Sequence, residues 1–270
     1  MTERVEWDEL PAELRDAVEA RTGPVIGTET VTSGFNCSVA LKVRTREDGT
    51  LFLKGVRTSD TAAVAGLRAE EQVNSLVSGI SPRIRHSVEA AGWRCLAFAH
   101  VEGRHVDYGP GTGDLGALAR TARRMHQVRT PTFALPQLAD GFAGHLRPGE
   151  ADALHGTHLL HTDTNPHNVL IDTSGGAYVV DWAMPALGPV WVDAVYLAVW
   201  LMACGQPPEG AVAWLNGFPV WRRADRRAVE TFVDVTCRHW TDRAGEKDAE
   251  PRNADFRRLL DASGRPRTGP

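Results

Sequence analysis

The fold is decided by one octet, His161-Thr162-Asp163-Thr164-Asn165-Pro166-His167-Asn168, and by the pair Asp181-Trp182, which begins thirteen residues after it. Apolar residues precede the octet at 159–160 and follow it at 169–171. This arrangement is typical of a loop held between two short strands. A third apolar run, at 178–180, ends directly before Asp181. The pattern predicts polar side chains placed on loops at the ends of short strands.

Three of these polar side chains form a set suited to phosphoryl transfer. Transfer from ATP needs a carboxylate that orients and deprotonates the acceptor hydroxyl, together with oxygen ligands for magnesium. Asp163 is the candidate catalytic base, and Asn168 and Asp181 are the candidate ligands of Mg²⁺, a hard ion that favours oxygen. Taken singly, each residue has a plainer interpretation, because Asp and Asn in loops mostly form turns. Their order and their position between strand-like runs favour the phosphoryl-transfer interpretation.

The octet resembles the H-G-D-x-x-x-x-N loop of the aminoglycoside phosphotransferase family, the small-molecule branch of the protein-kinase-like fold. Asp181-Trp182, followed by Gly188 and Asp193, resembles the D-W-x(5)-G-x(4)-D segment of that family. The resemblance covers residues 33–198 and is strong around residues 160–193. Departures from the family pattern occur at Thr162, where Gly is usual, and at Ala183 and Pro189. They leave the substrate and the subfamily open.

The resemblance implies an α+β, bilobal protein-kinase-like fold, with a small antiparallel-sheet lobe that contains one long helix and a larger, mainly helical lobe. We place the nucleotide-binding lobe at residues 1–102 and the catalytic and acceptor-binding lobe at residues 103–270. The implied activity is ATP- and Mg²⁺-dependent transfer of the γ-phosphate to a hydroxyl of a small molecule, with GTP in place of ATP left open. Two alternatives stay open: a kinase for a peptide hydroxyl, and a catalytically silent pseudokinase that acts as a nucleotide-binding or scaffold module.

Lys54 and Glu70 are the candidate residues for steering the phosphates. Apolar runs predict strands at 25–31, 37–45 and 50–56, and Lys54 lies in the third of them. A helix over residues 61–79 places Glu70 on the same face as its apolar positions, so we expect an ion pair with Lys54. Glu71 points about 100° away on an ideal helix and is the weaker candidate. The plainer alternative for Lys54 is a side chain that snorkels from an edge strand.

Two further segments correspond to nucleotide-binding parts of the resembled family. Ser33 and Gly34 lie between the first two predicted strands, in the place of the loop that covers the ATP phosphates. Residues 97–103 resemble the hinge on which adenine rests, and this implies hydrogen bonds to the backbone of Ala99 and Val101. The motif G-x-G-x-x-G at 111–116 is a rival nucleotide signature, but no strand ends directly before it. A loop that enters a helix over residues 114–128 is the better interpretation.

Composition and charge narrow the kinds of partner and the cellular location that we expect for the protein. A formal charge of −4, with acids and bases interspersed, does not favour nucleic acid, which calls for a basic patch. The longest apolar run, residues 194–204, is too short to span a bilayer and predicts a buried helix. The four cysteines are far apart without a C-x-x-C pair, and the first residues do not resemble a signal peptide, so we expect a cytoplasmic protein.

The oligomeric state does not follow from the sequence. From Ala194 onward there are 10 acidic and 12 basic residues, which does not favour a polycationic acceptor.

Overall fold

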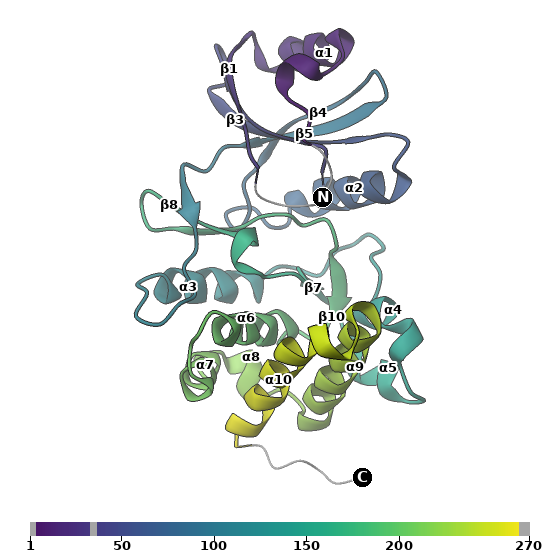
Figure 1. Cartoon of the computed structure of the whole chain (residues 1–270), viewed down its shortest axis with the longest axis vertical. Helices are drawn as coiled ribbons and strands as arrows, with labels where there is room; N and C mark the ends of the chain where they lie inside the picture. Colours follow the sequence, from purple (N-terminus) through teal and green to yellow (C-terminus); the bar gives the residue numbers. More distant parts are fainter. Residues whose placement is uncertain (1–3, 33–36, 265–270) are drawn as a thin grey trace. The chain divides into compact units, whose positions relative to one another are not determined.

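The computed structural model describes residues 4–32 and 37–264 (Figure 1). The chain divides into two compact units. Unit 1 contains residues 1–104 and 170–184, and unit 2 contains residues 105–169 and 185–270. The segment that carries Asp181 therefore belongs to the same unit as the N-terminal strands, although it follows the octet in sequence. Lobe boundaries at 1–102 and 103–270 stay a prediction.

Unit 1 is built on a five-stranded antiparallel sheet with the strand order β1-β2-β3-β5-β4. A hairpin turn at Asp48-Gly49 joins β2 to β3, with Gly49 at a φ of 73°. A left-handed residue at a tight turn is where glycine costs least. The strands are β1 (Val25–Thr30), β2 (Val39–Thr45), β3 (Thr50–Arg57), β4 (Ile84–Ala90) and β5 (Trp93–Ala99).

Each face of this sheet is covered by one helix, as Figure 1 shows. Because successive side chains of a strand point to opposite faces, odd and even residues of β3 separate. The odd residues, among them Leu53, pack with α1 (Ala12–Thr22). The even residues, among them Val56, pack with α2 (Thr61–Asn74). Lys54 is even-numbered, so its side chain lies on the face that α2 covers.

Local contacts set the bounds of both helices of unit 1. Helix α1 begins only at Ala12, because Pro11 separates it from a 3₁₀ turn at Trp7–Glu9. The helix predicted over residues 61–79 ends at Asn74. The Asn74 side chain donates to the carbonyl of Pro82 and accepts the N–H of Ile84, so it serves the next strand instead of continuing the helix.

Three short strands in the order β6-β8-β9 lead to the segment that ends at Asp181: β6 (Gly103–His105), β8 (Val169–Asp172) and β9 (Ala177–Val179). Gly103 is required by a close approach, because a Cβ at this position would lie 2.0 Å from the carbonyl oxygen of Ile171. The backbone N–H of Val179 donates to the carbonyl of Ile80 at 2.8 Å, which fixes β9 against the segment that follows α2.

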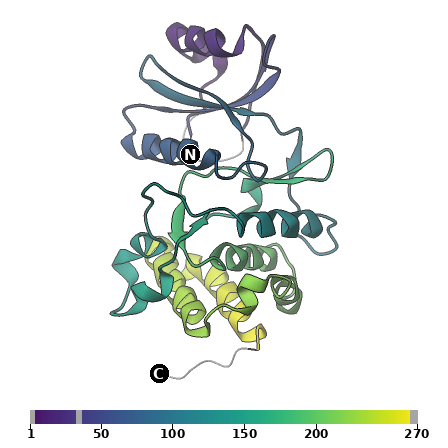
Figure 2. The ribbon, with the colours of Figure 1, turned by 180° about the vertical axis from the view of Figure 1, so that it is seen from behind.

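Unit 2 is mainly helical (Figure 2). Its one strand pair among the described residues joins β7 (His158–Leu160) to β10 (Ala186–Gly188) in antiparallel register, directly before the octet. The predicted apolar helix is α6 (Val192–Ala203), buried along most of its length. The remaining helices are α3 (Leu115–Met125), α4 (Leu138–Gly141), α5 (Glu150–Leu154), α7 (Pro208–Leu215), α8 (Pro219–Arg222), α9 (Arg226–Ala244) and α10 (Glu246–Ala262), with 3₁₀ turns at Ala143–His145 and Pro166–Asn168. The predicted α+β class is confirmed. Within residues 4–32 and 37–264, no helix has the length and apolar character needed to cross a bilayer.

Candidate active site

Lys54 is the centre of an ion-pair network in unit 1. Its Nζ lies 2.7 Å from Oε2 of Glu70 and 2.6 Å from Oδ1 of Asp181. Lys54 is 7% exposed and Glu70 is 3% exposed, so the three charges meet with little water around them. The sequence placed these residues on a strand, a helix and a distant loop, and the structure brings all three together. A lysine in this setting is fixed in one position, unlike a snorkelling side chain at a sheet edge.

The electrostatics keep Lys54 charged. Burial by itself lowers the pKa of Lys54, but the charges and hydrogen bonds of Glu70 and Asp181 outweigh it, and the net shift of the pKa is upward. A buried ammonium without such partners would lose its proton instead. The network therefore maintains a positive charge at a fixed point beside the Asp181 carboxylate, an arrangement suited to an anionic ligand such as a nucleotide phosphate.

Glu70 also holds the backbone that presents Asp181. Its second oxygen, Oε1, accepts the N–H of Trp182 at 3.2 Å. The indole of Trp182 is buried and donates to the carbonyl of Val179 at 3.1 Å. Asp181 has a φ of 64°, in the left-handed region that Asp tolerates better than most residues. Asp181 thus presents its carboxylate from a left-handed backbone, and Trp182 anchors that conformation.

Asp163 lies in unit 2 within a small set of amide donors. Nδ2 of Asn165 donates to Oδ1 of Asp163 at 2.9 Å, and Nδ2 of Asn168 donates to its backbone carbonyl at 2.9 Å and to Oδ2 at 3.2 Å. The Asp163 N–H donates to Nδ1 of His161 at 3.2 Å, so His161 supports the backbone of the loop. These contacts hold the carboxylate in one orientation.

Asp193 fixes the turn that precedes Asp163. It is fully buried on α6 and accepts the N–H of His161 at 2.8 Å and the N–H of Thr162 at 3.0 Å. Burial raises the pKa of Asp193, and the charge of His161 and these two N–H groups oppose that shift. Thr162 has a φ of 69°, which a β-branched residue rarely adopts. Thr162 stands where the resembled family has glycine, and its backbone keeps the left-handed conformation that glycine adopts easily.

The proposed Mg²⁺ ligands have suitable chemistry. The amide nitrogen of Asn168 donates to Asp163, and within the described part of the chain no hydrogen bond to its Oδ1 is found, so that oxygen is available to a ligand. Carboxylate and amide oxygens are what Mg²⁺ prefers, and it takes few of them from protein. Asn168 and Asp181 lie in different units, so the structure places each with its own neighbours: Asn168 with Asp163, and Asp181 with Lys54.

The residues predicted to bind adenine differ in the backbone groups that they have available for a ligand. The N–H of Ala99 donates to the carbonyl of Arg83 at 2.8 Å, so only its carbonyl remains for adenine. No backbone hydrogen bond of Val101 is found within residues 4–32 and 37–264, which leaves its N–H for a ligand. Ser33 and Gly34 lie outside the described residues. The glycine motif at 111–116 enters α3, where the carboxylate of Asp114 accepts the N–H of Asp107.

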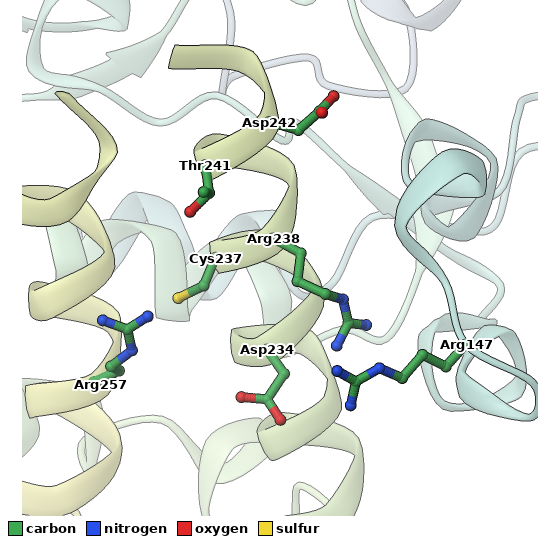
Figure 3. Close-up of a pocket in the computed structure, with 7 residues that line it drawn as sticks. All are labelled: Arg147, Asp234, Cys237, Arg238, Thr241, Asp242 and Arg257. Carbon is green, nitrogen blue, oxygen red and sulfur yellow. The ribbon is translucent and has the colours of Figure 1, made fainter. Parts of the chain in front are cut away.

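One pocket of unit 2 lies apart from these residues (Figure 3). It has a volume of about 420 Å³ and runs along α9. Arg238, one of its lining residues, is engaged by Glu150 and by the carbonyl of His145. The other lining residues are Arg147, Asp234, Cys237, Thr241, Asp242 and Arg257. None of the predicted site residues lines this pocket, and its mixed charges are largely paired.

Comparisons with known proteins agree with this arrangement. Residues 135–227, which include the octet and the Asp-Trp segment, match the model of the phosphotransferase enzyme family. No curated protein sequence matches the chain. Among solved structures, the fold is similar to that of a thermostable aminoglycoside phosphotransferase, APH(4)-Ia, in a ternary complex with AMP-PNP and hygromycin B (TM-score 0.61, 12% identity, covering 93% of this chain and 99% of that one).

Two kinases for small alcohols are also similar. Choline kinase LicA from Streptococcus pneumoniae has a TM-score of 0.59 and 11% identity, covering 93% of this chain and 97% of that one. A choline/ethanolamine kinase family protein from Mesorhizobium loti has a TM-score of 0.55 and 19% identity, covering 92% and 97%. At such identities the likeness establishes the fold, which is the protein-kinase-like fold of these enzymes. The family match over residues 135–227 and the shared fold bear out the resemblance to the aminoglycoside phosphotransferase family.

Proposed function

We propose that the chain is an ATP- and Mg²⁺-dependent phosphotransferase that moves the γ-phosphate to a hydroxyl of a small molecule. The observation that supports this most is the buried network in which Lys54 contacts both Glu70 and Asp181. A lysine with a purely structural role needs only one carboxylate as its partner. A lysine between two carboxylates, one of them on a strained loop, is an arrangement suited to receiving a phosphate and its metal.

Each residue has a defined role in the proposed reaction. Lys54, held by Glu70, contacts the phosphates of the nucleotide. Asp163 orients the acceptor hydroxyl and accepts its proton as the bond to phosphorus forms, and Asn165 and Asn168 hold its carboxylate in the productive orientation. Asn168 and Asp181 would hold Mg²⁺, which neutralises charge on the β- and γ-phosphates when bound. The carbonyl of Ala99 and the N–H of Val101 would bind adenine, with Ser33 and Gly34 near the phosphates.

The nucleotide is ATP in this proposal, and GTP is the competitor to test. One similar structure contains AMP-PNP and another, spectinomycin phosphotransferase APH(9)-Ia, contains ADP. The acceptors named for the similar enzymes range from antibiotics to choline, so the acceptor of this chain is a small hydroxylated molecule without a narrower identity. We place the reaction in the cytoplasm, where ATP is available and where unpaired thiols such as those of this chain persist.

The test is ATP turnover with Mg²⁺ and a panel of hydroxylated acceptors, compared between the wild-type protein, Asp181→Ala and Asp234→Ala. Asp234 is an exposed carboxylate of α9 and serves as the matched control. We expect Asp181→Ala to lose phosphate transfer while it keeps its fold by circular dichroism, and Asp234→Ala to retain transfer. Wild-type transfer by Asp181→Ala would refute the proposed role. Magnesium-dependent ATP binding without transfer to any acceptor would favour the pseudokinase alternative.

A further inference from the structure

Arg252 is held between two tryptophans of unit 2. It lies on α10, and its guanidinium carbon is 4.4 Å from the ring centroid of Trp200 on α6 and 4.4 Å from that of Trp240 on α9. Contact with two indole faces fixes the plane of a guanidinium and covers its faces, while the N–H groups at its edge remain directed outward. The three helices that supply these residues pack against one another (Figures 1 and 2).

In the part of the chain that the structure describes, no protein group accepts from the N–H groups of Arg252. Within residues 4–32 and 37–264, the structure shows no hydrogen bond and no ion pair from this guanidinium, although the side chain is half-buried. Asp255, three residues further along the same helix, lies 3.4 Å from Arg258 instead. Arg252 is not among the side chains with buried, unpartnered nitrogens, so its N–H groups reach solvent and are available to a ligand that accepts from them.

Arg252 is close enough to Asp163 for their charges to interact. Burial lowers the pKa of Arg252, and Asp163 is the first of the groups that oppose this shift, ahead of Tyr196 and Asp255. Asp163 is the candidate base, at which the acceptor hydroxyl must lie. A group bound by Arg252 would therefore belong to the same acceptor molecule or lie directly beside it.

The surroundings favour an anion over a cation. A second guanidinium, that of Arg243, lies 5.8 Å from the centroid of Trp240. An acceptor that carries several ammonium groups would meet a fixed positive charge at Arg252. A carboxylate or phosphate would instead meet a planar donor fork that matches its geometry.

We propose that Arg252, flanked by Trp200 and Trp240, is the binding subsite for an anionic group, a carboxylate or phosphate monoester, on the acceptor, an assignment that rests on the phosphotransferase function proposed above. Two other interpretations are outcomes of the test. In the first, Arg252 only ties α6, α9 and α10 together. In the second, the two tryptophans form a cage for a cationic acceptor, and Arg252 occupies it until that acceptor binds.

The experiment compares four probes that share primary hydroxyl groups: D-glycerate, glycerol 3-phosphate, glycerol and choline. Their binding to the full chain with Mg²⁺ and AMP-PNP is measured by ligand-observed NMR. The variants are Arg252→Met, which keeps a side chain between the indoles without the charge, Arg252→Lys, and the matched control Arg257→Met on the exposed side of the same helix. We expect the wild-type protein to bind the two anions at least tenfold more tightly than glycerol or choline, since a charge-assisted pair of this kind contributes roughly ten- to hundredfold in affinity.

Arg252→Met should lose that preference, Arg252→Lys should keep part of it, and Arg257→Met should keep all of it. Equal affinity for anions and glycerol in the wild-type protein overturns the inference, and so does an anion preference that survives in Arg252→Met. Tighter binding of choline by Arg252→Met than by the wild type identifies the cation cage instead. AMP-PNP affinity is measured in the same samples. A protein that does not bind AMP-PNP contradicts the proposed function, whereas one that binds AMP-PNP but shows no preference for anions contradicts the subsite alone.

Discussion

The carboxylate of Asp193 accepts the backbone N–H of Thr162 at 3.0 Å and so holds a β-branched residue at a φ of 69°. The left-handed region costs an L-residue about 1–2 kcal/mol, and the second hydrogen bond of Asp193, to the N–H of His161, helps to offset that cost. The catalytic loop thus keeps the conformation of a glycine-containing loop without the glycine. Its strain and its anchor can be tested separately.

Thr162→Gly should relieve the strain. Glycine adopts this φ freely but loses more backbone entropy on folding, so we expect a net gain of about 1 kcal/mol in the free energy of unfolding. Urea denaturation measures it. Thr173→Gly, at an exposed turn without a positive φ, is the control and should lose stability. Equal losses in both variants would show that Thr162 is not strained.

Asp193→Ala should remove the anchor. The buried N–H of His161 and the partly buried N–H of Thr162 would lose their hydrogen bonds to this carboxylate, which we expect to cost about 2–4 kcal/mol in total. The control Asp152→Ala, at an exposed carboxylate of α5, should change the free energy of unfolding by less than about 0.5 kcal/mol. Asp193→Asn retains one acceptor oxygen and should fall between the two. If Asp193→Ala were as stable as the control, the anchoring role would be wrong.

Glu70 and Glu71 are adjacent acids with different partners, Lys54 for Glu70 and Arg94 for Glu71. Glu70→Gln weakens the hold on Lys54 in the buried network, so we expect the Kd for ATP to rise by about tenfold, equivalent to about 1.4 kcal/mol. Glu71→Gln affects only a partly exposed pair and should leave the Kd for ATP unchanged. Isothermal titration calorimetry with both variants checks this. A larger effect at Glu71 than at Glu70 would contradict the assignment.

His126 should make unit 2 sensitive to acid. Burial, then the charges of His158 and Arg123, lower the pKa of His126 from 6.5 to about 4. Below about pH 6.5 the unfolded chain binds a proton that the folded chain excludes until about pH 4, so stability falls as the pH decreases through this window. This group alone should reduce the free energy of unfolding by about 2 kcal/mol between pH 7 and pH 5.

Urea unfolding at the two pH values tests this with His126→Gln and, as a control, the exposed His155→Gln. The His126 variant should show a smaller loss of stability at pH 5 than the wild type, whereas the control should behave like the wild type. An unchanged pH dependence in His126→Gln would assign the acid sensitivity to other groups, such as the half-buried His158, whose pKa is also lowered by burial.

Local patterns in the sequence were sufficient for the first three strands of the sheet and for half of the site. The alternation of β3 places Lys54 on the face of α2, and helical spacing places Glu70 there too, so their pairing follows from two periodicities. The strand-loop-strand context of the octet likewise places Asn168 beside Asp163. These relationships depend on residues within one element or one loop, which is where sequence patterns are most reliable.

Relationships that depend on packing between distant elements were not visible. The helix that ends at Asn74 was predicted to continue, because its apolar spacing continues and only the tertiary hydrogen bonds of Asn74 stop it. The contact of Arg252 with Trp200 and Trp240 needs three helices whose order in space no local signal gives. Asn165 was read only as part of the octet, yet its amide donates to the carboxylate of Asp163.

The central claim is that Asp163 accepts the proton of an acceptor hydroxyl during phosphoryl transfer. The most direct measurement is transfer from γ-labelled ATP to the acceptor panel by Asp163→Asn, with ATP affinity measured in the same preparation. We predict a Kd for ATP close to that of the wild type and a transfer rate lower by about 10²- to 10⁴-fold, the usual contribution of a general base. Transfer at the wild-type rate by Asp163→Asn would contradict the account.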